Sequence, residues 1–327
     1  MLIKSANLTQ PSFVYPTDYG QGSRGLWSGG GNTHWPSNQY TNNTHYITIS
    51  TPGNSSLFGS VTSSLIRCTG TSGRGRGIIS GGRTHTTPVN TISYVNIATP
   101  GNPTDFGTLT ATRQGAASTS NGTRGLILSG AIPLPYADHV SSVDYITIAT
   151  GGNAGNFGNY AESRTGHFSG DSALSDGFYC VTQGRKTGQS YYDYWSINTL
   201  SDSTKWGDQR TGGVKDAEYI SAVSNGTRGV WCGGYDGSWS KKMDYLSFAT
   251  QGNALQYGEM NQYKYQGGGV SDGQRGVIGG DGYRDPTPIL EYFNISTAAG
   301  SAVVSATFGL CQAPNNLRMQ AAVYAGD

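Results

Sequence analysis

The chain has 327 residues, which is enough for one large domain. Glycine supplies 50 of them, only 13% of the residues are charged, and a net charge of +1 offers little attraction for a nucleic-acid backbone. Thr, Tyr, Ile and Val recur in short runs bounded by Gly, Asn, Asp and Ser, as strands and tight turns require. The composition therefore predicts an all-β protein and argues against nucleic acid as a partner.

The amino terminus reads MLIKSANLTQPSFVYPTDYG and lacks the apolar stretch of a signal peptide. No later segment approaches the roughly 18 consecutive apolar residues of a membrane span. We therefore expect neither classical secretion nor insertion into a membrane.

Three motifs recur at intervals of about 50 residues. The first is an Arg-Gly followed by an apolar run that usually ends in Gly-Gly. The second is a Tyr within a strand-like xxYIxIxT pattern, and the third is an aromatic residue followed by Gly. Their members are Arg24, Arg76, Arg124, Arg228 and Arg275; Tyr46, Tyr94, Tyr145, Tyr194, Tyr245 and Tyr292; and Phe58-Gly59, Phe106-Gly107, Phe157-Gly158, Trp206-Gly207 and Tyr257-Gly258.

Residues 111–158 show the unit that these motifs define. Strand a (ATRQGAAST) leads through Asn121-Gly122 into strand b (RGLILSG), and after a longer loop strand c (SVDYITIAT) leads through Gly152-Asn153 into a short strand d before Phe157-Gly158. Asn-Gly favours the tight turn of an antiparallel hairpin. Units of four strands and about 50 residues are typical of the blades of a kelch-type β-propeller.

The number of blades depends on the two ends of the chain. ATFGLCQAPNN and MQAAVYAGD near the carboxyl terminus resemble strands a and b, so the pattern favours seven blades, with six as the alternative. Residues 2–9 would then supply an outer strand and close the ring beside the carboxyl-terminal strands. The whole chain, 1–327, is one domain whose predicted repeats are 12–59, 60–107, 108–158, 159–207, 208–258, 259–304, and 305–327 completed by 1–11.

Two sets of residues are expected to serve the framework. Each Arg of the Arg-Gly motif should stack on a Tyr or bond to a carbonyl of the next blade, although a ring of ligand-binding charges around a channel is the alternative. Repeat four departs from the motif and has Asp176-Gly177 instead. The cysteines fit no zinc or redox spacing and should be small buried strand residues; they are Cys68, Cys180, Cys232 and Cys311.

Variation between the repeats is concentrated in the loop that joins strands b and c. These loops span 31–42, 83–90, 131–142, 185–193, 235–241 and 281–289, and equivalent loops emerge on one face of a propeller. Flat rings with a polar edge suit sugar stacking or a protein interface, although the same rings could pack between blades. The candidate binding residues are Trp35, Tyr40, Tyr136, Tyr191, Tyr192, Tyr235, Trp239 and Tyr283.

No catalytic residues and no cofactor are predicted. The five histidines are scattered over four repeats without the spacing of a metal-binding motif, and no Gly-x-Ser-x-Gly elbow is present. Asp281 and Asp285 could contribute to a calcium site but lack further acidic ligands, so no metal site is predicted.

The segments SNGTRGVWCGGYDGS (224–238) and TISYVNIATPGNPTDFG (91–107) resemble repeats of kelch-like β-propeller proteins of tailed bacteriophages. The resemblance covers nearly the whole chain but rests on framework positions. It implies a non-enzymatic virion protein, assembled in the host cytoplasm, in a tail fibre, tail tip or particle surface. Its partners would be other virion proteins and a host glycan or receptor. A head decoration protein and a kelch-like adaptor that binds a protein partner are alternatives, and a propeller enzyme is favoured least.

Overall fold

The computed structural model describes residues 24–32, 39–132, 140–161, 173–183, 191–210, 212–214, 220–235, 238–265, 267–279, 288–297, 304–312 and 321–324. The regular elements in these ranges are the strands β1 to β26. None of the described segments forms a helix with the length and apolarity that a membrane span requires.

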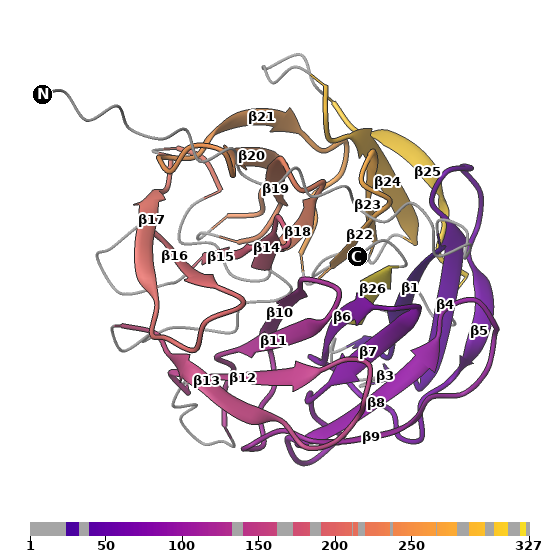
Figure 1. Cartoon of the computed structure of the whole chain (residues 1–327). Helices are drawn as coiled ribbons and strands as arrows, with labels where there is room; N and C mark the ends of the chain where they lie inside the picture. Colours follow the sequence, from indigo (N-terminus) through magenta and orange to yellow (C-terminus); the bar gives the residue numbers. More distant parts are fainter. Residues whose placement is uncertain are drawn as a thin grey trace, which may run out of the picture.

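Antiparallel sheets of four strands radiate from a common axis as the blades of a β-propeller (Figure 1). From the innermost strand outward, blade 1 contains β26 (Ala321–Tyr324), β1 (Arg24–Ser28), β4 (Asn43–Thr48) and β5 (Ser56–Ser60). Blade 2 contains β6 (Thr69–Gly73), β7 (Arg76–Ser80), β8 (Thr91–Asn96) and β9 (Thr104–Thr108). Blade 3 contains β10 (Ala117–Ser120), β11 (Arg124–Leu128), β12 (Ser142–Thr147) and β13 (Gly155–Asn159).

The other three blades follow the same order. Blade 4 contains β14 (Ala173–Ser175), β15 (Tyr179–Gln183), β16 (Tyr191–Ser196) and β17 (Thr204–Asp208). Blade 5 contains β18 (Ser221–Ser224), β19 (Arg228–Cys232), β20 (Lys242–Ser247) and β21 (Leu255–Glu259). Blade 6 contains β22 (Gly268–Ser271), β23 (Arg275–Gly279), β24 (Ile289–Asn294) and β25 (Ala306–Leu310), and a short hairpin of β2 (Gly31–Asn32) and β3 (Gln39–Tyr40) extends blade 1.

The propeller has six blades, so the prediction of seven is wrong. The segment ATFGL, interpreted above as an inner strand, is β25, the outer strand of blade 6. Its Phe308-Gly309 is a sixth aromatic-Gly pair, which the sequence analysis overlooked. The aromatic-Gly pairs lie within the outer strands, as in β13, and do not follow them. The last strand, β26, is the inner strand of blade 1, so the carboxyl terminus supplies one strand to that blade and does not begin a seventh.

The two ends of the described chain meet in blade 1. Strand β26 pairs antiparallel with β1, with Gly25 opposite Tyr324 and Ser28 opposite Ala321. The inner strands contact one another in the order β26, β6, β10, β14, β18, β22 and back to β26. The predicted pairing of residues 2–9 lies outside the described residues.

The inner strands consist mainly of Gly, Ala, Ser and Thr, as in TGTSG of β6 and ASTS of β10. These side chains are small enough for neighbouring blades to approach closely at the axis. Ser118 Oγ donates to the carbonyl of Gly70 (2.7 Å), and a Cβ added at Gly269 would lie 2.4 Å from the carbonyl oxygen of Ala222. Small residues are therefore a steric requirement of this ring.

The core lies between adjacent blades. Strand b is almost wholly buried in every blade. Strands b and c of adjacent blades contribute to common apolar clusters. One cluster, for example, joins Ile78 and Ile92 of blade 2 to Ile127 and Ile146 of blade 3. Burial of these side chains, at about 25 cal/mol per Å² of apolar surface, holds the blades together.

The Arg-Gly motif joins each blade to the next. In five blades the guanidinium lies 4.6–5.0 Å from the ring centre of the repeated Tyr of its own blade, as for Arg124 over Tyr145. The same guanidinium donates to a main-chain carbonyl of the following blade, in this case that of Ile197 (2.8 Å). The equivalent acceptors are Ile97, Ile148, Ile295 and Ile49. The structural interpretation of these arginines is confirmed.

Blade 4 replaces this arginine with an aromatic residue. Tyr179 pairs with Ser196 as Arg124 pairs with Thr147, so it occupies the arginine position. Its ring makes edge contacts with Tyr194 and Trp206, each at 5.5 Å between centres. An apolar contact takes the place of the charged one at this position.

The aromatic-Gly motif also has a steric cause. A Cβ added at its glycine would lie only 1.9–2.4 Å from a carbonyl oxygen in the c–d turn of the next blade. The same turn carries an Asn or Asp whose side chain accepts the N–H of the residue after the glycine; Asn253, for example, accepts from Asp208 (2.8 Å). Side chain and backbone together join each outer strand to its neighbour.

Candidate binding face

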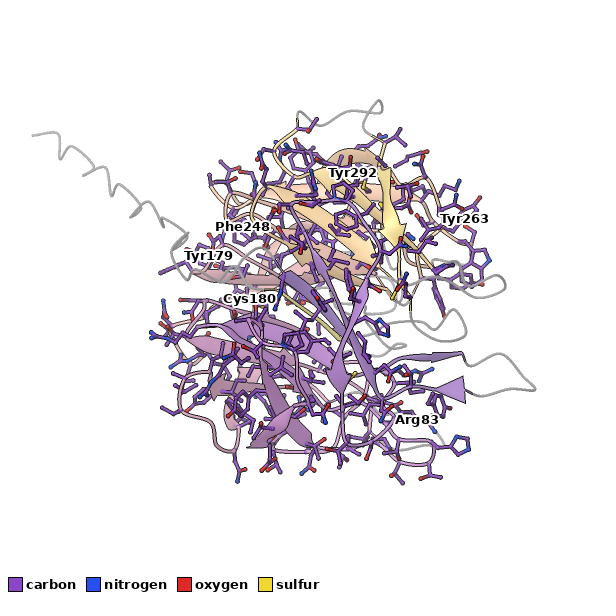
Figure 2. All side chains as sticks on the ribbon, turned by 90° about the vertical axis from the view of Figure 1, so that its right-hand side faces the viewer. Arg83, Tyr179, Cys180, Phe248, Tyr263 and Tyr292 are labelled. Carbon is purple, nitrogen blue, oxygen red and sulfur yellow. The ribbon has the colours of Figure 1, made fainter. Side chains whose placement is uncertain are left out.

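The strand order places two kinds of connection on opposite faces of the propeller. In every antiparallel blade the a–b and c–d turns share one face, here called the turn face. The b–c loops and the linkers that lead from strand d of one blade to strand a of the next share the other, here called the loop face. Viewed edge-on, Arg83 and Tyr263 lie toward one side, and Tyr179 and Phe248 lie toward the opposite side (Figure 2).

Buried charged pairs hold the linkers beneath the loop face. Asp144, directly before Tyr145 in β12, accepts hydrogen bonds from Arg113 (2.9 Å) and from the Thr110 N–H (2.8 Å) in the linker between blades 2 and 3. The side chains of Asp144 and Arg113 are both fully buried. Burial lowers the pKa of Arg113, and the neighbouring Asp144 opposes that shift.

The same position of strand c carries acids in blades 5 and 6. Asp244 binds Arg210 (2.7 Å) and accepts the Val214 N–H (2.5 Å). Burial raises the pKa of Asp244, and the hydrogen bond from Arg210 opposes the rise. Sequence analysis missed these pairs, although a basic residue in the linker and an acid before the repeated Tyr were both visible in the sequence.

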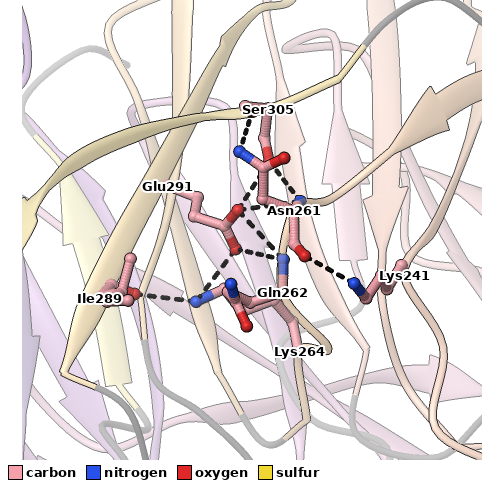
Figure 3. Close-up of polar contacts among 7 residues, drawn as sticks. All are labelled: Lys241, Asn261, Gln262, Lys264, Ile289, Glu291 and Ser305. Atoms are coloured by element: carbon pink, nitrogen blue, oxygen red, sulfur yellow. Dashed lines mark hydrogen bonds and ion pairs between the residues drawn. The ribbon is translucent and has the colours of Figure 1, made fainter.

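The linker between blades 5 and 6 is fixed by the most extensive of these networks (Figure 3). Glu291 accepts from the Asn261 N–H (2.9 Å) and from Ser305 Oγ (2.8 Å), and it lies 3.3 Å from Lys264 Nζ. Lys264 also donates to the carbonyl of Ile289 (2.8 Å). The linker backbone on either side of Lys264 is therefore held in a defined position.

The Gly-Gly that ends strand b receives this linker. The second glycine donates its N–H to a linker carbonyl, from Gly82 to Arg113 (2.9 Å) and from Gly234 to Lys264 (2.7 Å). At the first glycine, Gly233, φ is +72° and an added Cβ would lie 2.4 Å from the Lys264 carbonyl oxygen. The Gly-Gly therefore allows a close backbone approach, and its partner is the linker to the next blade.

Three aromatic rings gather above this junction on the loop face. Tyr235 and Trp239 come from the b–c loop of blade 5, and Tyr265 comes from the linker to blade 6. The ring centres are 4.7 Å apart for Tyr235 and Trp239, 4.9 Å for Trp239 and Tyr265, and 6.2 Å for Tyr235 and Tyr265. All three residues are half-buried.

A lysine and a fourth ring extend the group. Lys241 Nζ lies 4.8 Å from the centre of the Tyr263 ring and donates to the Asn261 carbonyl (2.7 Å). The Tyr263 residue is 52% exposed. Tyr235, Trp239, Lys241, Tyr263 and Tyr265 are here called the aromatic strip. Sequence analysis identified Tyr235 and Trp239 as binding residues but missed the two tyrosines, because it did not count the linkers as part of this face.

Of the other six predicted binding residues, three lie outside the described residues and three lie within strands. Trp35, Tyr136 and Tyr283 lie outside the described residues. Tyr40 lies in β3, half-buried, with its ring 5.3 Å from that of His85 in the neighbouring b–c loop. Tyr191 is half-buried in β16 with Lys205 Nζ 5.6 Å from its ring.

Tyr192 does not lie on a loop. It is part of β16, is fully buried, and stacks on Trp231 of blade 5 at 4.3 Å with an interplanar angle of 3°. Burial raises the pKa of its hydroxyl well above the usual value. Tyr192 is a core residue between blades 4 and 5, because its ring packs in the cluster that contains Trp231 and Leu246 of blade 5.

The prediction that the cysteines are small buried residues is confirmed, since all four are free and buried. Cys180 and Cys232 lie within strands, whereas Cys68 and Cys311 lie directly beside them. Within the described ranges, no three His, Cys, Asp or Glu side chains cluster so as to hold a metal ion. Asp281 and Asp285 lie outside those ranges.

Comparison with protein-family models and with curated proteins finds no match to this chain. The arrangement of its own residues therefore carries the functional argument. That arrangement combines a repeated, internally bonded framework with a face on which, among the described residues, rings and a cation gather at the junction of blades 5 and 6.

Proposed function

We propose that this protein is a non-enzymatic binding module of a tailed-phage virion, placed at a tail fibre, a tail tip or the particle surface. Its loop face would contact a host glycan, or it would attach to other virion subunits. The proposal is carried by the contrast between two sets of residues. The repeated motifs are engaged within the framework, whereas the aromatic strip occurs once among the residues that the structure describes. The likeness of the repeats to those of phage propellers supports the virion assignment.

Attachment to another subunit is supported by a second feature, the rim. The outer strands of three consecutive blades expose apolar side chains, namely Leu255 of β21, Leu310 of β25 and Leu57 of β5. The outer strands of blades 2 to 4, TDFGT, GNFGN and TKWGD, carry no exposed Leu, Ile or Val. A partner subunit would bury the apolar half of the rim and leave the polar half exposed.

Two measurements test this proposal. Immunogold labelling of phage particles with an antibody to the purified chain should mark the tail or the surface. A panel of immobilised host-type oligosaccharides should then retain the purified protein. Absence of the chain from particles would contradict the virion assignment, and burial of the loop face in a particle map would leave subunit attachment as its role.

A further inference from the structure

The aromatic strip has a regular geometry. Residues 239–241 and 263–265 run side by side, since Trp239 contacts Tyr265 and Lys241 contacts Tyr263. Alternate residues of extended segments share a side. The intervening Ser240 and Lys264 are buried, so the rings and the ammonium group share the outward side. The strip is thus one surface made by two chain segments.

The framework does not need aromatic residues at these positions. In blade 2 the residues that correspond to Tyr235 and Tyr265 are Arg83 and Gln114, because Gly82 donates to the Arg113 carbonyl (2.9 Å) as Gly234 donates to the Lys264 carbonyl (2.7 Å). In blade 1 the corresponding residues are Gly31 and Ile66, since Gly30 donates to the Leu65 carbonyl (2.7 Å). The backbone junction therefore forms with aliphatic or polar side chains, and the rings of blade 5 serve another purpose.

The charge of Lys241 indicates that the ligand carries a negative group. Its ammonium group is held by the Tyr263 ring and the Asn261 carbonyl, and it makes no ion pair with an Asp or Glu of the described ranges. An ammonium group positioned beside an exposed ring can pair with a carboxylate while the ring stacks on an apolar face. Sugars that carry a carboxylate present both features within one ring.

We propose that the aromatic strip binds a saccharide bearing a carboxylate, such as a uronic or sialic acid. The sugar ring stacks on the Trp239 and Tyr263 side of the strip, and its carboxylate pairs with Lys241. This inference rests on the proposed role of the loop face in glycan recognition and specifies its sector and its ligand class.

Binding of the full chain to immobilised uronic-acid and sialic-acid oligosaccharides tests the inference, with the same oligosaccharides after chemical reduction of the carboxyl groups as the neutral comparison. We expect the wild-type protein to prefer the acidic panel by roughly tenfold, on the scale of one charge-assisted contact. Lys241→Met should abolish that preference, and Lys241→Arg should retain it. Trp239→Ala should weaken binding to both panels.

Lys205→Ala is the matched control, because Lys205 also lies over a tyrosine ring but on the rim, and it should leave binding unchanged. Glycan binding that ignores both the carboxyl group and Lys241→Met would overturn this inference while the proposed function stands. No binding to any acidic or neutral saccharide would remove glycan recognition altogether. Circular dichroism of each variant separates these outcomes from loss of folding.

Discussion

The turn face and the loop face of this propeller are built from the same six blades but use their residues differently. On the turn face, the same contacts recur from blade to blade, including arginine to the next carbonyl and glycine against the next turn. On the loop face, the backbone junctions recur, yet the side chains above them differ in every described blade. The comparison indicates that the ring requires recurring side-chain contacts on the turn face, whereas on the loop face it requires the backbone junctions and accepts different side chains above them.

Blade 4 is an exception to the repeated contacts of the turn face. Tyr179 fills the arginine position through contacts with aromatic rings, and the exposed Phe178 lies beside it. The ring therefore tolerates a change of chemistry at a framework position when the volume between the blades remains filled.

The largest effect is expected from the buried charges beneath the loop face. Asp144→Ala leaves the guanidinium of Arg113 buried without its carboxylate, which should cost about 3–5 kcal/mol of folding free energy. Urea unfolding measures this loss. Asp208→Ala is the control, since Asp208 and Lys205 form an exposed pair worth less than about 1 kcal/mol. Equal losses for the two variants would contradict the anchoring role of Asp144.

The second largest loss of folding free energy is expected from replacing the glycine of the aromatic-Gly motif. In Gly207→Ala the new Cβ would lie 2.0 Å from the Gly252 carbonyl oxygen, and the forced shift should cost about 3 kcal/mol. Gly252→Ala changes the other partner of the same contact, where an added Cβ meets nothing within 4 Å. Differential scanning calorimetry should show a lower Tm for the first variant alone, and a similar Tm for both would refute the steric argument.

Removing the arginine contact should lower the folding free energy by a smaller amount. Arg124→Ala removes a cation–π contact and a hydrogen bond to the Ile197 carbonyl, which together contribute about 1–2 kcal/mol. Arg124→Lys should retain part of this stability because it keeps the charge. If chemical denaturation finds no difference between wild type and Arg124→Ala, the arginines do not join the blades as described.

A pH effect is expected at blade 5. Burial raises the pKa of Tyr257 to about 12 from the usual 10.0, and its hydroxyl donates to the Asn294 carbonyl of blade 6 (2.5 Å). A group whose pKa is raised by folding stabilises the fold below its unfolded pKa, and that contribution is lost as the pH rises through the folded value. Stability should therefore fall between pH 10 and about 12. The fall should be shallower in Tyr257→Phe, and identical profiles would exclude this residue as its source.

The sequence was sufficient to predict the fold class, the four-stranded unit and the arginine role, because each depends on contacts that recur at a fixed interval. The number of blades was predicted incorrectly because ATFGL can be interpreted as either an inner or an outer strand. Only the recurring Phe308-Gly309 identifies it as an outer strand. The pairing of β26 with β1 brings together segments about 300 residues apart, which a local pattern does not specify.

The candidate site was predicted less completely, for a physical reason. Tyr235 and Trp239 were found because they lie in a variable loop, whereas Tyr263 and Tyr265 belong to the next linker. Their proximity depends on the Gly234 to Lys264 hydrogen bond and the Glu291 network, both of which are tertiary contacts. Tyr192 was misplaced because the loop was assumed to extend into what is the buried start of β16.

The most direct test compares one aromatic residue on each face, the half-buried Trp239 and the exposed Phe178. Trp239→Ala alters the loop face and Phe178→Ala alters the turn face, and neither should change the unfolding free energy by more than about 1 kcal/mol. Retention on the immobilised acidic oligosaccharides should fall roughly tenfold for Trp239→Ala, in line with the loss of a stacking ring, and stay unchanged for Phe178→Ala. The reverse pattern would show that the turn face binds and would contradict the central claim.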